Sequence, residues 1–252
     1  MSKVIGADAA KLAGLQIDTL QKARDGQITL EHWEWFNKLT KTERDSFSGV
    51  SKLSPFNRAS NALSDLFDRQ IEILRDRGCP NQVLARLISQ KSQVLAKAST
   101  IVFKDNRIPF LPIIPFSSLS LSTQMSMVKN GNKAGFTNLK ANEIKDIVST
   151  PNQPYYIFDV EDGTDMLGRS VRKATELIKN LDRSPLTAAE VISLSIQTDA
   201  LSKRYVDAGG SRSESDDGAP HLALFVSQPK LNWNFVDYSS DRCGSASCGS
   251  RS

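Results

Sequence analysis

Hydrophobic residues recur at helical spacing through the first hundred positions of the chain. Apolar side chains there fall three or four residues apart, which places them on one face of an α-helix. The longest stripe follows Ser54-Pro55, a pair suited to a helix start, and ends near Gly78, where a left-handed residue can close the helix. A further helix is expected over 81–98. The pattern predicts a helical region over residues 1–100.

After residue 100 the pattern changes to an alternation of strands and helices. Strands are expected over 154–163, 221–226 and 230–236, and helices over 142–148, from Ser170 to about Leu181 and from Thr187 to about Leu201. Thr187 and Glu190 form a capping box, a strong sign of a helix start. We therefore predict a mixed-sheet domain with flanking helices, of the α+β or α/β class, over residues 101–252. We also expect this domain to fold without the helical region.

The segment 108–116 carries a proline at every third position. Pro109, Pro112 and Pro115 match the three-residue turn of a polyproline II helix, which would make the segment a docking ligand. The residues between the prolines are isoleucine, leucine and phenylalanine, whose exposure to water would be costly. We therefore favour an extended segment packed against the core of the second domain.

Composition and charge narrow the classes of function. The 252 residues have a net charge of +4, with 39% hydrophobic and 24% charged residues, which is typical of a globular protein. No cluster of lysine and arginine indicates a nucleic-acid surface, and no apolar run is long enough for a membrane span. Three cysteines and a start without a signal-peptide pattern fit a reducing compartment. We expect a cytoplasmic protein whose partner is a small molecule or another protein.

The strongest candidate for chemistry is the acidic sequence that ends the strand expected at 154–163. Asp159 and Glu161 are two positions apart, so in a regular strand they would lie on one face, and Asp162 follows directly. Two such carboxylates can hold Mg²⁺ or Mn²⁺, or can act as an acid–base pair in catalysis. The alternative is an acidic turn that simply ends the strand, with Gly163 supplying a positive φ.

Two further patterns suggest ligand contacts near the end of the chain. Ser211 and Arg212 follow a glycine in a polar loop over 209–220, where a guanidinium beside exposed backbone N–H groups would suit a carboxylate or phosphate. A flexible loop without a ligand is the alternative. Cys248 with Arg251 is a candidate reactive or ligand-binding pair.

The familiar catalytic and metal-binding motifs are missing. The sequence contains no GxGxxG, no P-loop and no HExxH. Zinc is disfavoured, because Cys243 and Cys248 would need Cys79 and one of only two histidines as further ligands from remote positions. Histidine also offers little material for acid–base catalysis.

Several segments together resemble an uncharacterised family of prokaryotic proteins, a domain of unknown function. They are IPFLPIIP, QMSMVKNG, PYYIFDVEDG, SPLTAAEVISL, GSRSES and the terminal SCGSR. The resemblance covers roughly residues 107–252 and implies a prokaryotic, cytoplasmic protein with one structural unit there. It implies no activity.

Two classes of function remain. In the first, the protein is a binding or interaction module for a small anionic ligand or a protein partner. In the second, it is an enzyme that uses the carboxylates at 159–162 around a divalent metal or as acid–base groups, with Arg212 holding an anionic substrate. We favour the first class, because the sequence has no recognisable nucleophile–base pair.

Overall fold

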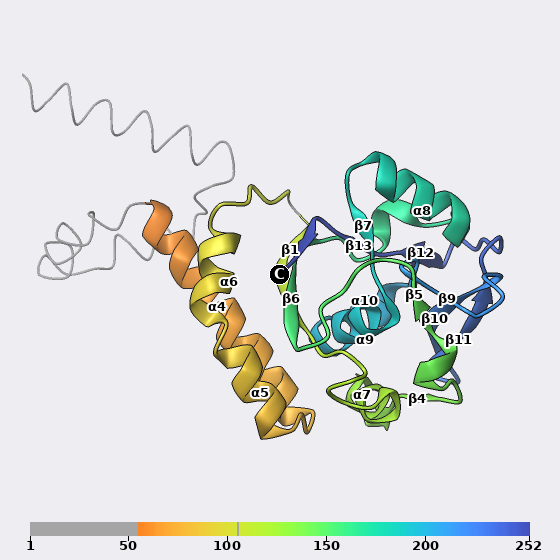
Figure 1. Ribbon diagram of the computed structural model, residues 1–252, viewed down its shortest axis with the longest axis horizontal. Coiled ribbons are helices and arrows are strands. Elements are labelled where there is room, and N and C mark those ends of the chain that lie inside the picture. The colour runs from red at the N-terminus through yellow and green to blue at the C-terminus, as the bar shows by residue number, and fades with distance from the viewer. Residues whose placement is uncertain (1–54, 105) are drawn as a thin grey trace, which may run out of the picture. The chain divides into compact units, whose positions relative to one another are not determined.

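The computed structural model describes residues 55–104 and 106–252, and the helices expected before residue 54 lie outside them. Helices and strands are mixed along the described chain, which confirms the predicted α+β class (Figure 1). By their mutual contacts, Ala59–Ser252 form one unit. In the described part of the chain, no helix combines the length and the apolar character that a membrane crossing requires.

The described chain begins with three helices, α4 (Pro55–Asp76), α5 (Asn81–Ile88) and α6 (Lys91–Ala98). After α4, Gly78 has a φ of +85°, the left-handed conformation predicted from its position. The helix expected over 81–98 is divided in two. At the division, Nε2 of Gln90 donates a 2.8 Å hydrogen bond to the carbonyl oxygen of Pro154. The division thus lets the helical segment bond to a loop far along the chain.

These helices pack beside β1 (Ile108–Ile113) and β6 (Tyr155–Val160) (Figure 1). The two strands belong to a three-stranded antiparallel sheet in the order β1, β6 and β14 (Ser250–Arg251). The ring of Phe67 in α4 stacks on that of Tyr156, with centroids 5.5 Å apart. Nε2 of Gln70 donates a 2.7 Å hydrogen bond to the carbonyl oxygen of Phe110. The proline-bearing segment is therefore a buried strand, as favoured from its composition.

Helices and sheet share one hydrophobic core. Buried side chains from Phe67 in α4 to Cys248 near the end of the chain belong to a single cluster. The domain boundary expected at residue 100 falls inside this cluster.

A second, five-stranded sheet has the order β12 (Cys243–Ser245), β8 (Tyr205–Asp207), β10 (Gly218–Phe225), β11 (Gln228–Phe235) and β4 (Phe136–Thr137). β10 and β11 form the predicted hairpin. Its turn residues, Val226 and Ser227, have φ values of 49° and 65°, the left-handed pair that a two-residue hairpin turn requires. Helix α8 (Val171–Asn180), which Ser170 caps as predicted, packs against β12.

Helix α9 (Ala188–Gln197) contacts β1 of the first sheet and β10 of the second. Every residue from 188 to 196 is buried, so this helix has no polar stripe that faces solvent. The predicted capping box is present, and the backbone N–H of Thr187 donates a 2.8 Å hydrogen bond to Oε2 of Glu190. The helix thereby carries a carboxylate into the core.

The last residues of the chain form strands that pair with earlier parts of the fold. β12 pairs with β8, β13 (Ser247–Cys248) pairs with β7 (Ser184–Pro185), and β14 pairs with β6. The Gly/Ser-rich composition has a steric reason at Gly244, where a Cβ atom would lie 2.1 Å from the carbonyl oxygen of Gly163. Gly163 itself has a φ of +98°, as predicted. Small residues let this segment pass between neighbouring backbones.

The remaining short elements are α7 (Leu121–Met127), β2 (Lys129–Asn130), β3 (Lys133–Ala134), η1 (Ala141–Glu143), β5 (Lys145–Asp146), η2 (Thr164–Met166), α10 (Ala200–Lys203) and β9 (Ser211–Arg212). The prediction of a helix over 142–148 is wrong. In its place η1 is followed by β5, which pairs with β9. A segment this short gains little from an isolated helix, so pairing with a distant strand determines its conformation.

The segment 209–220 is not the flexible loop that its composition suggested. Residues 209–212 and 218–220 are buried, and the exposed part is 214–217. A Cβ atom on Gly210 would lie 2.6 Å from the carbonyl oxygen of Pro185, so this glycine permits a close backbone approach. Glycine here serves packing rather than flexibility.

Limited proteolysis should therefore cut the tip of this segment and spare its base. Trypsin should leave the bond after Arg212 intact, because that residue is 9% exposed and its backbone pairs with β5. A glutamyl endopeptidase should cut after Glu214 sooner than after the helical residues Glu72 and Glu176. Mass spectrometry of the first fragments provides the measurement. An early tryptic cut at Arg212 would show that the segment opens readily.

Candidate metal centre

Three side chains of metal-ligand type lie on one face of the five-stranded sheet: Asp207 on β8, His221 on β10 and Cys243 on β12. β8 lies between the other two strands, and Asp207 is directly paired with His221. On its other side Asp207 pairs with Ser245, two residues after Cys243. Because paired residues share a face and side chains alternate along a strand, all three side chains project from the same face.

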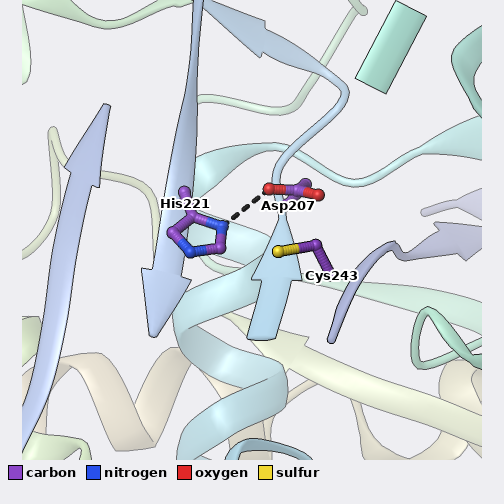
Figure 2. A group of neighbouring side chains, drawn as sticks. All are labelled: Asp207, His221 and Cys243. Atoms are coloured by element: carbon purple, nitrogen blue, oxygen red, sulfur yellow. Dashed lines mark hydrogen bonds and ion pairs between the residues drawn. The ribbon is translucent and has the colours of Figure 1, made fainter. Parts of the chain in front are cut away.

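The three side chains point toward one another (Figure 2). Their ligand atoms all lie within 4.8 Å of one another, and Nδ1 of His221 is 2.7 Å from Oδ1 of Asp207. Asp207 and Cys243 are buried, whereas 14% of the His221 side chain is exposed. The cluster is therefore reached from solvent on its histidine side.

The carboxylate of Asp207 is only partly satisfied. Oδ1 is hydrogen-bonded to His221, but Oδ2 is buried and has no hydrogen-bond partner among the described residues. Leaving a buried acceptor unpaired costs about 1–3 kcal/mol. A cation bound beside this oxygen would remove that cost.

Burial determines the protonation state of the Cys243 thiol. Burial first, and the negative charge of Asp207 second, raise the pKa of Cys243 to about 11. Without a cation the thiol is protonated at neutral pH and is a poor nucleophile. In Figure 2 its sulfur also lies on the Nδ1 side of the imidazole, the side that Asp207 occupies. A nucleophile–histidine–acid triad instead places acid and nucleophile at opposite ring nitrogens.

The donor set and its spacing fit a zinc ion. Zinc–ligand bonds of about 2.0–2.3 Å place tetrahedral ligand atoms about 3.3–3.8 Å apart. The three ligand atoms here lie within 4.8 Å of one another, and an ion between His221 and Asp207 would replace their 2.7 Å hydrogen bond. Thiolate and imidazole favour Zn²⁺ over Mg²⁺ or Mn²⁺, which prefer oxygen ligands. Asp207, His221 and Cys243 would fill three of four positions. The fourth would stay open for water or another ligand.

The rim of the cluster is aromatic and basic. The ring of Tyr205 meets the imidazole of His221 edge-on, with centroids 5.7 Å apart. The guanidinium of Arg242 lies 4.6 Å from the centre of the Tyr205 ring, and Arg242 is exposed. Asp241 next to it is exposed as well, and the two charges shift the pKa of Cys243 in opposite directions. An anion could therefore bind at this rim through the guanidinium of Arg242 rather than through an overall positive charge.

The carboxylates predicted to form a metal or catalytic site are each bonded to other groups of the protein. Asp159 has a φ of 52°, which interrupts the regular strand alternation, and it pairs with Arg183. Glu161 is buried, and its Oε1 accepts hydrogen bonds of 3.0 and 2.9 Å from the backbone N–H groups of Gly163 and Asp165. Burial raises the pKa of Glu161. The two carboxylates therefore serve different parts of the acidic turn.

The rest of this turn is also paired with arginine. Oδ2 of Asp162 lies 2.5 Å from Nη1 of Arg204, and Asp165 pairs with Arg107 at 2.8 Å. Burial raises the pKa of Asp162, but hydrogen bonds from Thr164 and Arg204 outweigh that effect and lower it overall. These contacts match the acidic-turn alternative. The metal or catalytic role of Asp159, Glu161 and Asp162 stays a prediction.

Three of the four predicted ligand-binding residues lie around the N-terminal end of α9. Oγ of Ser211 accepts a 2.9 Å hydrogen bond from the backbone N–H of Ala188. Arg251 forms an ion pair with Glu190. Cys248 is buried, and the charges of both residues act on its thiol. Burial raises the pKa of the Cys248 thiol to about 12, which disfavours reactivity. Ser211 and Arg251 thus bond to α9, and a ligand-binding role for these three residues stays a prediction.

The guanidinium of Arg212, the fourth predicted ligand-binding residue, is hydrogen-bonded to the backbone of its own segment. Its Nη1 donates 2.8 Å hydrogen bonds to the carbonyl oxygens of Gly209 and Ser211. Burial lowers the pKa of this guanidinium. In the described residues, no hydrogen bond or ion pair joins Arg212 to the carboxylates at 159–162. A ligand-binding role for Arg212 stays a prediction.

Sequence reasoning missed the cluster because it searched for zinc ligands among cysteines and histidines alone. Asp207 lies in a short strand for which no element was predicted, and it has no motif around it. His221 and Cys243 are 22 positions apart, and only the pairing of β8 with both β10 and β12 unites them. One usable signal was the start of the predicted hairpin, which placed His221 at a strand end.

Comparisons with known proteins relate the chain to one family model. No curated protein and no solved structure matches the chain. The model of a family of unknown function, DUF5701, matches residues 70–252. The match extends from the second half of α4 to the last strand and so includes the cluster on β8, β10 and β12. The resemblance to an uncharacterised family is thereby confirmed over a longer span than expected, and the chain belongs to this family of unknown function, DUF5701.

Proposed function

We propose that the protein is a metal-dependent ligand-binding protein. Asp207, His221 and Cys243 would hold one zinc-type ion, whose open position takes water or a small anionic ligand. The observation that supports this most is the convergence of three ligand atoms within 4.8 Å beside a carboxylate oxygen that lacks a donor. Three protein ligands with one free position are typical of zinc sites that bind or activate a small molecule.

Two further observations support the proposal, one for the anionic ligand and one for the metal. Arg242, exposed over the ring of Tyr205, offers a guanidinium to an anionic ligand. All three cysteines of the chain are free, and a thiol persists as a metal ligand in the reducing cytoplasm that the sequence suggests. Hydrolysis by a metal-bound water would use the same open position. The contacts at 159–162 give the alternative enzyme site less support, because Asp159 and Asp162 are paired with arginines and Oε1 of Glu161 accepts two backbone N–H groups. Only Oε2 of Glu161 is buried there without a hydrogen-bond partner among the described residues.

Cobalt titration tests the metal site directly. Metal-free protein should bind one Co²⁺, and its spectrum should show the charge-transfer band of a cysteine thiolate bound to cobalt. Zn²⁺ should displace the cobalt and, at 100 times its dissociation constant, stabilise the fold by about 2.7 kcal/mol. Cys243→Ser should remove the band, and Asp207→Asn should weaken binding by at least about tenfold, because a ligand charge is lost.

A matched control is Cys79→Ala, since this buried cysteine lies outside the cluster. It should keep both the band and the stoichiometry. A cobalt complex without a thiolate band, or one that Cys243→Ser leaves unchanged, would refute the proposed site. Stabilisation by Mg²⁺ that Asp159→Asn with Glu161→Gln abolishes would favour the carboxylate site instead.

A further inference from the structure

A cavity of about 640 Å³ lies away from the cluster, within the range of small-molecule sites. Three remote segments form it: the C-terminal end of α4, the β2–β3 turn, and the chain from the end of α9 into α10. Ile73, Ile196 and Leu201 supply apolar surface. The other lining groups are mostly charged or polar.

Two cationic side chains line this cavity without a described partner. Arg77 follows α4, and Lys129 begins β2. Among the described residues, neither side chain makes a hydrogen bond or an ion pair. Two uncommitted cations beside one cavity would attract an anionic group, and a guanidinium can bind a carboxylate through two hydrogen bonds.

Acceptor groups line the same cavity. Asp76 is the last residue of α4, and its exposed carboxylate has no partner among the described residues. Gln197 donates through Nε2 to the carbonyl oxygen of Gln70 at 3.1 Å, while its Oε1 is buried and unpaired in the described chain. A carboxylate at a helix C-terminus is unfavourable, because the helix dipole is negative there. Both acceptors would gain from a donor, preferably a cationic one.

The neighbouring polar groups are already engaged and hold the wall in place. Asp199 pairs with Lys203 at 3.0 Å, and Oγ1 of Thr198 donates to the carbonyl oxygen of Leu194 at 2.7 Å. Nδ2 of Asn130 donates to the carbonyl oxygen of Ser227 at 2.9 Å. The groups left for a ligand are therefore two cations, Arg77 and Lys129, one carboxylate, Asp76, and the neutral amide oxygen of Gln197.

From this arrangement we infer a second binding site, for a small dipolar molecule that carries both a carboxylate and an ammonium group, such as a free amino acid. Arg77 and Lys129 bind the carboxylate. Asp76 and Oε1 of Gln197 accept hydrogen bonds from the ammonium group. The site is independent of the proposed metal centre, since no lining residue belongs to that cluster.

The test is a thermal-shift and calorimetric screen of the whole chain with each proteinogenic L-amino acid. Propionate and ethylamine serve as probes that carry one of the two groups. At least one amino acid should raise the melting temperature, and neither single-group probe should match it. Lys129→Ala, Arg77→Ala and Asp76→Asn should each raise the dissociation constant about tenfold, the loss expected for one charge-assisted hydrogen bond.

Lys173→Ala on the exposed face of α8 is the matched charge control and should bind normally. Lys129 is itself exposed, so its variant tests the site without loss of buried packing. No shift with any amino acid would overturn the inference. An equal shift with propionate, or affinities unchanged in Lys129→Ala and Asp76→Asn, would overturn it as well.

Discussion

Removal of helices α4–α6 should abolish cooperative unfolding of the remaining chain. Phe67, Leu74 and Leu87 are almost fully buried against the three-stranded sheet and its surroundings. Burying a side chain of this size contributes about 1.5–3 kcal/mol, so three together approach the 5–15 kcal/mol that stabilises a typical domain. Their loss would also expose Tyr156 and Phe110 to water. The packing therefore leads us to expect the opposite of the independent folding suggested by the sequence.

Two fragments decide between these expectations. The fragment 59–252 should melt in one sharp transition, because it contains the whole hydrophobic cluster. The fragment 101–252 should melt broadly or aggregate, and addition of the missing helical segment as a peptide should restore part of its near-ultraviolet circular dichroism. A sharp transition for 101–252 alone would show that the boundary at residue 100 is a true domain boundary.

Local signals in the sequence predicted individual elements well. The cap at Ser170, the capping box at Thr187 and Glu190, and the turn glycine at Gly163 each depend on a few neighbouring residues. Such interactions can be read from spacing, because the partner groups are three or four positions apart. The same holds for the β10–β11 hairpin, whose strands are consecutive in the chain.

Pairings between strands that are far apart in the chain could not be predicted from the sequence. The segment 142–148 has helical spacing, but β5 pairs with β9 more than sixty positions later. The terminal Gly/Ser-rich residues look like a loose tail, yet they pair with three different sheets. In both cases the partner strand, rather than local preference, decides the conformation. Composition alone gives no information about that partner.

The candidate metal centre could not be predicted from the sequence for the same reason. Asp207, His221 and Cys243 come together only through the register of three strands, one of which pairs in parallel and one in antiparallel direction. Conversely, the acidic sequence at 159–162 looked like a site because its carboxylates are close in the sequence. The arginines that pair with Asp159 and Asp162 come from elsewhere in the chain. Adjacent charges in a sequence do not reveal partners that only folding supplies.

Arg251→Ala should be among the most destabilising single substitutions in the described chain. Its guanidinium donates to both carboxylate oxygens of the fully buried Glu190, at 2.7 and 2.8 Å, and to Oγ of Ser184 and the carbonyl oxygen of Pro185. The hydroxyl of Tyr155 donates to the same carboxylate at 2.8 Å. Removing one partner of such a buried pair leaves an uncompensated charge and costs about 3–5 kcal/mol.

Urea unfolding of matched variants measures this cost. Arg172→Ala removes an arginine that also binds a carboxylate, that of Asp237, through two hydrogen bonds, but on the surface. It should leave the free energy of unfolding almost unchanged, because solvent screens that pair. In an Arg251→Met background, Glu190→Gln should recover part of the lost stability, since it removes the unpaired buried charge. If Arg251→Ala costs no more than Arg172→Ala, Arg251 is free to serve a ligand, as its position in the sequence first suggested.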